Sequence, residues 1–321
     1  MRRRTPKRPP QRSQLRWRSS AGSWRSKVRF GGHESFPVRE TWLSKGLILL
    51  HEDPSAFEDS LIADRLGVGA NMAKSIRHWL RLTRLADGAG KGGLTLTELG
   101  KLVLAYDRAM LLPATWWALH VNVCSQNGEA IAWHWLFSRF QNDHRFDRVQ
   151  CVEALTKQVA SEGQRMPSPR TVVDDISCLL ASYARPLPPP PDDPEDATDC
   201  PFRQLGLLVH YRESDTYRFT RGPKAIPPEI LCYALAAAFR EERATVAEID
   251  VPVREALARP GGPGRVLALS AEAFAEALSD AERLLGPKRL RSEMVGGDRV
   301  IRLAPLTTIE WLIEHYRSAA G

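Results

Sequence analysis

Cysteine pairs and long apolar runs are both missing from this 321-residue sequence, and each absence narrows the class of protein. Its five cysteines are scattered, and no two of them stand at the C-x-x-C spacing of many metal and redox sites. An odd number of separate thiols favours reduced side chains in a cytoplasm over a disulfide framework. No apolar run approaches the roughly 18 residues that cross a bilayer. We therefore expect a cytoplasmic protein without a membrane-spanning segment.

Acidic residues are missing from positions 1–29, which hold eleven of the 45 lysines and arginines. The other 292 residues therefore carry 34 bases against 38 acids, a net charge of −4, so the overall charge of +7 belongs to this basic arm. The arm is too poor in apolar residues to become ordered alone. Its Trp17 and Trp24 could stack on bases while the arginines neutralise phosphates; alternatively, the arm is a solubilising extension. It is not a secretory signal, because no apolar core follows the charges.

A helix-turn-helix is predicted after the arm, within a first module at residues 30–106. A tight turn at 67–69 separates a short helix from a second helix of about 71–82, with Asn71 as its expected N-cap. Apolar residues recur at helical spacing on one face and are expected in the core. A basic second helix of this kind is shaped to lie in the DNA major groove, and the next hairpin, with Lys91 at its tip, resembles a wing. The expected DNA contacts of this helix are Asn71, Lys74, Arg77, His78 and Arg81.

The cluster of side chains best suited to catalysis or metal binding precedes this motif. His33 and Glu34 lie in an irregular stretch, and Arg39 begins a helix expected to run to Leu50, with Pro37 in its first turn. A histidine or a glutamate can act as a base or a metal ligand, and an arginine can hold a phosphate. The alternative is a hydrogen-bonded loop that pins the first helix to the rest of the module.

The second module is expected at residues 107–222. Its aromatic stretch 107–148 is predicted to form core, not a ligand cage. A second helix-turn-helix follows, in which Ser168 caps a helix running to about Tyr183 with Arg170 exposed near its start. Asp174 and Asp175 would repel phosphates, so this unit is either a structural copy or a second DNA reader. A proline-rich linker or exposed loop at 185–199 and a hairpin turning at 212–216 complete the module.

The third module is expected at residues 223–321. A buried helix at 229–240 opens it, followed by a helical stretch at 246–260, a turn and strand at 261–270, a helix at 271–286 and a hairpin turning at 296–298. A basic cluster on this hairpin could meet phosphates or form a solvated face; its residues are Lys288, Arg289, Arg291, Arg299 and Arg302. The fold class is therefore mainly α with small β-hairpins (α+β), in tandem winged-helix or helix-turn-helix modules.

Several blocks resemble one bacterial family whose domain has no assigned function. They are FGGHESFPVRETWLSKG, LGVGANMAKSIRHWL, LTLTELGKLVL, the 114–117 stretch and DCPFRQLGLL with YRFTRGPKAIPPEI, and they cover roughly residues 28–318. The residues that match the family's blocks are His33, Glu34, Phe36, Arg39, Trp42, Gly67, Gly69, Asn71, Arg77 and Trp79. Ser35 stands where the family often has threonine, and the hydroxyl is retained.

This family includes the B component of Ssp DNA phosphorothioation systems, and the resemblance implies a role in sulfur modification of DNA for phage defence. It implies nicking of one DNA strand together with a cysteine desulfurase, an ATPase and a reductase-like sulfur-transfer protein. For such a cut we expect His33 and Glu34 as base or metal ligand and Arg39 on the phosphate, with Mg²⁺ or Mn²⁺ as the candidate cofactor and its ligands unknown.

Motifs for cutting DNA are otherwise missing, because no spaced Asp…Glu-x-Lys cluster or paired-histidine nuclease motif is present. The alternative is therefore a non-catalytic DNA-binding adaptor that positions the sulfur-transfer partners. A compact transcriptional regulator fits less well, because several linked modules and an acidic body are unlike a small repressor. Since winged-helix units commonly pair, we expect a homodimer on double-stranded DNA.

Overall fold

The computed structural model describes residues 28–90, 93–125, 129–140, 143–189, 200–239 and 248–319. Nearly all of the basic arm, including Trp17 and Trp24, lies outside these residues, and so does Lys91.

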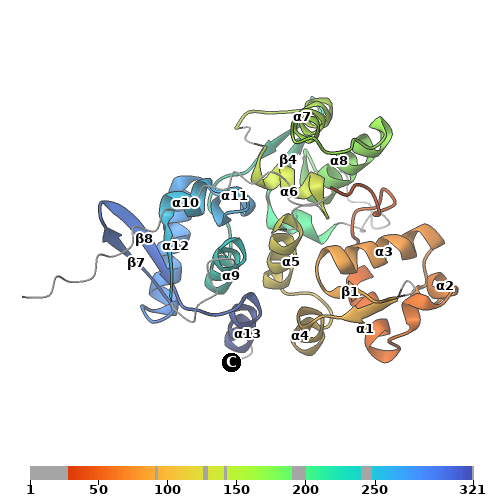
Figure 1. The fold of residues 1–321 in the computed structure, drawn as a ribbon, viewed down its shortest axis with the longest axis horizontal. Helices are drawn as coiled ribbons and strands as arrows, with labels where there is room; N and C mark the ends of the chain where they lie inside the picture. The colour runs from red at the N-terminus through yellow and green to blue at the C-terminus, as the bar shows by residue number, and fades with distance from the viewer. Residues whose placement is uncertain are drawn as a thin grey trace, which may run out of the picture.

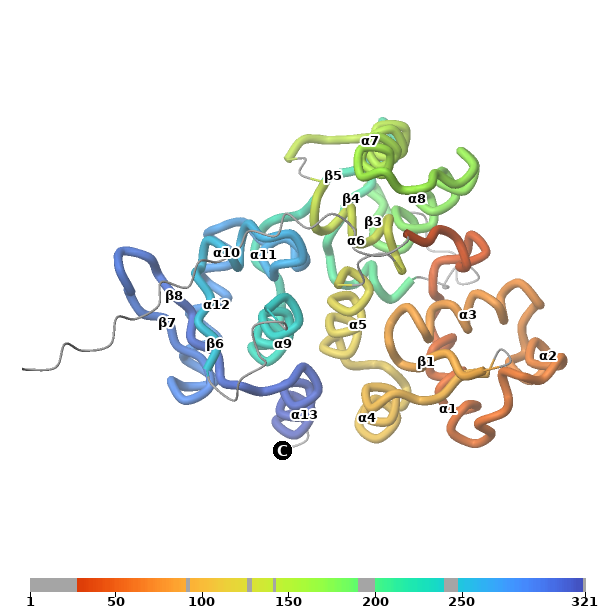
Figure 2. Tube along the Cα trace, viewed as in Figure 1, coloured from red at the N-terminus to blue at the C-terminus, as the bar shows by residue number. Residues whose placement is uncertain are grey.

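Two helices occupy the centre of the molecule. α5 (Pro113–Ser125) packs against α9 (Pro228–Ala238), and α13 (Thr308–Ala319) packs against α9 from below in the view of Figures 1 and 2. Residues 114–124 of α5 and 229–236 of α9 are all buried, because both helices are apolar almost all round. The predicted deep burial of α9 is confirmed.

The N-terminal elements lie to one side of this centre, drawn from orange to gold in Figure 1. Gly67 ends α2 in the left-handed conformation (φ 67°) that glycine adopts without strain, and α3 begins three residues later. The buried residues of α3 recur at helical spacing, as predicted. The elements are α1 (Trp42–Glu52), η1 (Ala56–Glu58), α2 (Ile62–Leu66), α3 (Ala70–Leu82), β1 (Ala86–Gly88), β2 (Leu94–Leu96) and α4 (Glu98–Tyr106).

Two local predictions for this unit are wrong. The N-cap of α3 is Gly69, and the side chain of Asn71 instead accepts a hydrogen bond from Lys74 Nζ at 3.2 Å. Pro37 does not open α1, which begins at Trp42, five residues later. The intervening chain turns sharply, and the cap Thr41 has a left-handed backbone (φ 63°).

The middle unit lies at the top of Figure 1. Ser168 caps α8 as predicted, with its Oγ accepting from Thr171 N–H at 3.2 Å. The 212–216 hairpin is also confirmed, and β3, which begins the expected linker, pairs parallel to β4. The elements are α6 (Ile131–Ser138), α7 (Arg148–Ser161), α8 (Pro169–Tyr183), β3 (Ala184–Leu187), η4 (Pro201–Leu205), β4 (Leu208–Tyr211) and β5 (Thr216–Phe219).

The C-terminal elements pack on the other side of α9. Their sheet has the strand order β6-β8-β7, and the hairpin turns at Gly296 and Gly297 as predicted. The elements are β6 (Ile249–Pro252), α10 (Val253–Ala258), α11 (Pro263–Val266), α12 (Ala271–Leu285), β7 (Leu290–Val295) and β8 (Asp298–Leu303).

The predicted order of the first half of this unit is wrong. The stretch 246–260, expected as helix, contains strand β6 before α10, and its Ile249 and Val251 are buried in alternation. The stretch 261–270, expected as turn and strand, contains α11. A side chain at Gly264 would stand 2.8 Å from Leu257 Cα, so glycine permits a close approach that the local pattern does not reveal.

The buried apolar residues of all these elements form one contiguous core. The aromatic residues of the 107–148 stretch belong to it, as predicted. The fold is mainly helical with small sheets, an α+β arrangement. Among the described residues, no helix is both long enough and apolar enough to span a membrane.

Candidate functional site

The chain between Val28 and α1 contains a strained loop. Gly31, Gly32, Glu34 and Ser35 have φ angles of 74°, 90°, 49° and 63°, so four of five successive residues have left-handed backbone. For Glu34 and Ser35 this conformation costs energy, and it persists only where neighbouring contacts impose it. We call residues 31–36 the GHES loop.

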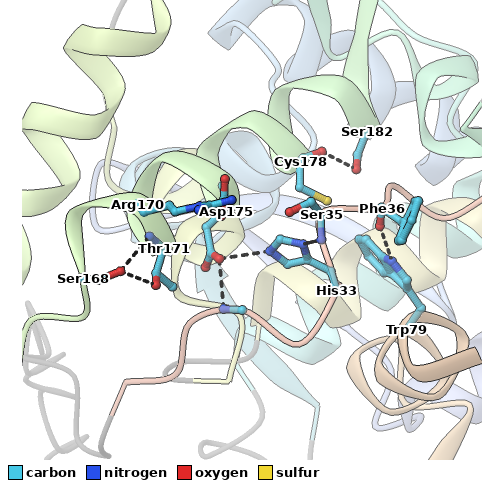
Figure 3. Close-up of polar contacts among 12 residues, drawn as sticks. His33, Ser35, Phe36, Trp79, Ser168, Arg170, Thr171, Asp175, Cys178 and Ser182 are labelled. Carbon is cyan, nitrogen blue, oxygen red and sulfur yellow. Dashed lines mark hydrogen bonds and ion pairs between the residues drawn. The ribbon is translucent and has the colours of Figure 1, made fainter. Parts of the chain in front are cut away.

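His33 supplies those contacts (Figure 3). Its Nδ1 accepts from Ser35 N–H at 3.0 Å, so its Nε2 carries the proton and donates to Asp175 Oδ1 at 3.0 Å. The same carboxylate oxygen accepts from Gly31 N–H at 2.9 Å. His33 and Asp175 are each only 2% exposed. The buried pair therefore fastens the GHES loop to α8, 142 residues further along the chain.

This geometry corresponds to the pinned-loop alternative for His33. Both ring nitrogens are engaged and the ring is buried, so in this arrangement His33 holds the loop and does not reach a ligand. Asp175 was expected only to repel phosphates, yet it is the partner of His33. Its place in the sequence contained a clue: it stands beside Val172 and Ile176 on the buried stripe of α8, where a carboxylate needs a partner.

The GHES loop also contacts α3. Trp79 Nε1 donates to Phe36 O at 3.0 Å, and a Cβ at Gly32 would stand 2.5 Å from His78 Nδ1. His78 was expected to face solvent and DNA, but it lies half-buried against Gly32. Burial, together with His33 and Arg81, lowers the pKa of His78 to about 3, so His78 brings no positive charge to the surface at neutral pH.

Glu34 and Arg39 lie differently from His33. The Glu34 side chain is exposed at the tip of the GHES loop. Arg39 is half-buried, with its guanidinium carbon 5.5 Å from the Trp42 ring centre and 6.0 Å from that of Phe36. The structure therefore joins His33 to Asp175, not to Arg39, and leaves Glu34 as the accessible carboxylate of the loop.

A cationic face runs along α3 beside this loop. Lys74 and Arg81 are exposed and Arg77 is half-buried. None of the three forms an ion pair with any residue that the structure describes. Partial burial, and to a lesser extent the neighbouring charge of Arg81, lower the pKa of Arg77. Asn71 is exposed on the same helix. We call Lys74, Arg77 and Arg81 the α3 cationic face.

The other expected DNA contacts differ from this face. Arg170 is exposed on α8, where its Nε lies 3.8 Å from Asp174 Oδ2. On the C-terminal hairpin, the arginines of the expected basic cluster are paired with acids: Arg289 with Glu314, Arg291 with Glu248, Arg299 with Glu282, and Arg302 with Asp250 and Glu293. Much of the positive charge expected on that hairpin is therefore neutralised within the protein.

Residues 30–316 match the family described as "Protein of unknown function (DUF4007)", and the chain belongs to this family. Its fold is similar to two crystal structures of SspB, one of them magnesium ion-bound. In each case the TM-score is 0.77 at 24% identity, over 90% of this chain and 88% of the SspB chain. No curated protein matches the sequence.

The magnesium-bound SspB structure raises the question of a metal site here. Within the described ranges, no three His, Cys, Asp or Glu side chains come together to hold a metal ion. Asp175 Oδ1, the buried carboxylate oxygen at the GHES loop, already accepts two N–H groups. The described residues do not fit a bound divalent cation, and no chemical step is derived through one.

Proposed function

We propose that this protein is a DNA-binding component of a bacterial DNA phosphorothioation system and that it nicks one strand to allow sulfur insertion. The observation that carries the proposal is the α3 cationic face. It has no counter-ion among the residues that the structure describes, and it lies beside a strained loop with an accessible carboxylate. Cations without internal partners are available to phosphates, whereas paired arginines are not. The likeness of fold to SspB supports the same function.

In this proposal the three units with helix, helix and hairpin are winged helices, the first presents α3 to the major groove, and the boundaries fall near residues 106 and 222. The protein acts in the cytoplasm as a homodimer on double-stranded DNA. Its partners are the cysteine desulfurase, the ATPase and the reductase-like sulfur-transfer protein of the same system.

Glu34 is the residue we propose as general base. It takes a proton from a water molecule, the water oxygen forms a bond to phosphorus, the ester P–O bond breaks, and the leaving oxygen takes a proton from solvent. Lys74 and Arg77 bind neighbouring phosphates, and Arg39 binds the phosphate whose ester bond breaks. His33 is a positioning residue that fixes the loop through Asp175.

Relaxation of supercoiled plasmid tests the nicking. The wild-type chain should yield nicked circles, and Glu34→Gln should slow their formation by about 100-fold or more, the usual contribution of a general base. Glu40→Gln, a change at another exposed glutamate before α1, is the matched control and should nick like the wild type. Equal rates for wild type and Glu34→Gln would remove Glu34 from the mechanism.

A non-catalytic adaptor is the second candidate, favoured by the burial of His33 and the lack of a fitting metal-ligand set among the described residues. It predicts that the purified chain binds plasmid but leaves it supercoiled with Mg²⁺ or Mn²⁺ present. Failure of any duplex binding at low salt would reject both candidates.

A further inference from the structure

A cavity of about 670 Å³ lies where the N-terminal unit meets the central helices. Its walls come from the chain before α1, the C-terminal half of α3, β1 and the start of α4 on one side, and from α5, α9 and α13 on the other. Cavities of a few hundred to about 1,000 Å³ are the size that small ligands occupy. The cavity therefore has room for one nucleotide-sized molecule.

Among the charged side chains that line this cavity, Arg29 and Glu129 pair with each other at 3.3 Å, but four others do not pair with one another. Arg81, Arg84, Asp87 and Glu98 all line it, and none of the four forms an ion pair with any residue in the described part of the chain. All four are exposed, so a bound ligand can reach them. A ligand that carries both an anionic group and hydrogen-bond donors would satisfy the arginines and the carboxylates together.

Arg84 stands at a position where the backbone favours glycine. Its N–H donates to Arg81 O at 3.0 Å, and Leu85 N–H donates to Leu80 O at 2.9 Å, the pattern of a Schellman motif that ends α3. Arg84 is the left-handed residue of that motif, with φ 61°. Thr97 Oγ1 donates to Arg84 O at 2.7 Å and holds it there. Strain of this kind in a non-glycine residue points to a use for its side chain.

Hydrogen bonds hold the cavity wall that α5 and α9 form in one arrangement. Tyr233 O–H donates to Asn122 Oδ1 at 2.8 Å, and Asn122 Nδ2 donates to Thr83 O at 3.2 Å. The second hydrogen of Asn122 Nδ2 has no acceptor among the residues that the structure describes, although this side chain is 7% exposed and lines the cavity. Phe30, half-buried on the cavity wall, offers an aromatic surface on which a base can stack.

We infer that this cavity binds one nucleotide, with its phosphate on Arg81 and Arg84 and its base between Phe30 and the Asn122 amide. The choice of ligand rests on the proposed DNA-binding function, because Arg81 belongs both to the cavity and to the α3 cationic face. A nucleotide extruded from the bound strand and a free nucleotide share this chemistry. Extrusion from a duplex costs a few kcal/mol, which a prepared pocket can offset.

Two probes distinguish these sources with the full chain. One is a set of duplexes with 2-aminopurine at successive positions, because the fluorescence of 2-aminopurine rises when the base leaves the stack. The other is free deoxyadenosine monophosphate, titrated by calorimetry. We expect a fluorescence increase at one duplex position, saturable binding of the mononucleotide, or both. A chain that responds to neither probe would overturn the inference.

Two variants link the response to the cavity. Arg84→Gly removes the guanidinium and relieves the left-handed backbone, so it should raise the melting temperature while weakening the response about tenfold or more. Gly88→Phe adds bulk to the wall beside Arg81, 3.6 Å from its Nε, and should also abolish the response. Because both variants keep Lys74 and Arg77, each should still bind unmodified duplex, with a smaller loss of affinity than the double variant Lys74→Gln with Arg77→Gln.

The outcomes separate the two proposals. A response that persists in both variants contradicts the nucleotide pocket even when duplex binding is strong. A wild-type chain that binds no duplex rejects the proposed function, and the calorimetric titration then decides the pocket independently.

Discussion

Glu34 and Arg84 both have left-handed backbone, and they stand near opposite ends of the segment that runs from the GHES loop through α3. Glycine at either position would avoid a cost of roughly 1–2 kcal/mol. Hydrogen bonds of neighbouring residues impose both conformations: His33 and Asp175 for the loop, and Thr97 for Arg84. These contacts therefore fix the backbone at two exposed charged residues.

Asp175→Ala tests the loop contact. It would leave His33 Nε2–H and Gly31 N–H without acceptors in a buried place, so the free energy of unfolding should fall by about 2–4 kcal/mol in urea denaturation. Asp175→Asn keeps an acceptor oxygen and should recover much of the loss. Asp174→Ala, at the half-buried neighbouring acid, should change stability by less than about 0.5 kcal/mol. Similar losses in the two alanine variants would contradict the loop-fastening role.

At the level of elements, α3 and the β7–β8 hairpin present two different electrostatic surfaces. Both are rich in cations, but Lys74, Arg77 and Arg81 of α3 form no ion pair with the described residues, whereas Arg291 makes two hydrogen bonds to Glu248, at 2.7 and 2.8 Å. Phosphate binding at the hairpin would first have to break such contacts. The same formal charge therefore has different availability on the two elements.

The salt dependence of duplex binding shows which of the two elements, α3 or the β7–β8 hairpin, contacts DNA. Each phosphate contact contributes about one unit to the slope of log affinity against log salt concentration, so Lys74→Gln with Arg77→Gln should reduce that slope by about two. Arg291→Gln with Arg299→Gln removes the same formal charge from the hairpin and should leave the slope unchanged. If the double variant on the hairpin changes the slope and the double variant on α3 does not, the assignment of the DNA contact to α3 is wrong.

The elements also show what could be predicted from the sequence and what could not. Helical spacing and turn residues were enough for α3, α8, α12 and the three hairpins, because these depend on local patterns. Local patterns did not predict α11, because its Gly264 is needed for close packing against α10 and such a contact is not visible in the local sequence. The partner of His33 was equally hidden, because no spacing rule joins residues 142 positions apart. Arg84 was missed because its importance lies in a backbone angle.

At the scale of the whole molecule, one apolar core joins all the units, and buried histidines lie within it. His120 is fully buried between Tyr183 O–H, 2.9 Å from Nδ1, and Val266 O, 2.8 Å from Nε2. Burial lowers the pKa of His120 to about 4, although the contact with Val266 O opposes the shift. The folded state therefore resists protonation of His120 at a pH where an unfolded chain accepts it.

This difference predicts acid sensitivity. An unfolded histidine takes up its proton near pH 6.5, and folded His120 does so only near pH 4, so the unfolded state binds more protons between these values. Stability should be complete above about pH 6.5 and fall by about 1.4 kcal/mol per pH unit for this histidine as the pH drops towards 4. His78, with its pKa near 3, acts in the same direction.

Urea denaturation at several pH values measures the effect. His120→Gln should be less stable at pH 7.5, because it loses buried hydrogen bonds, but its stability should fall less steeply between pH 6 and 4.5. Identical slopes for the variant and the wild type would show that His120 does not contribute to the acid sensitivity.

The hydroxyl groups of Thr115 and Tyr316 lie 2.6 Å apart, joining the first turn of α5 to the last helix across 201 positions. During synthesis, α5 and α9 leave the ribosome well before α13 exists. The side of α9 that α13 covers in the folded protein is therefore exposed to solvent until α13 has been synthesised. A chain that ends before α13 would leave this apolar side of α9 in solvent, so it should aggregate more readily than the full chain.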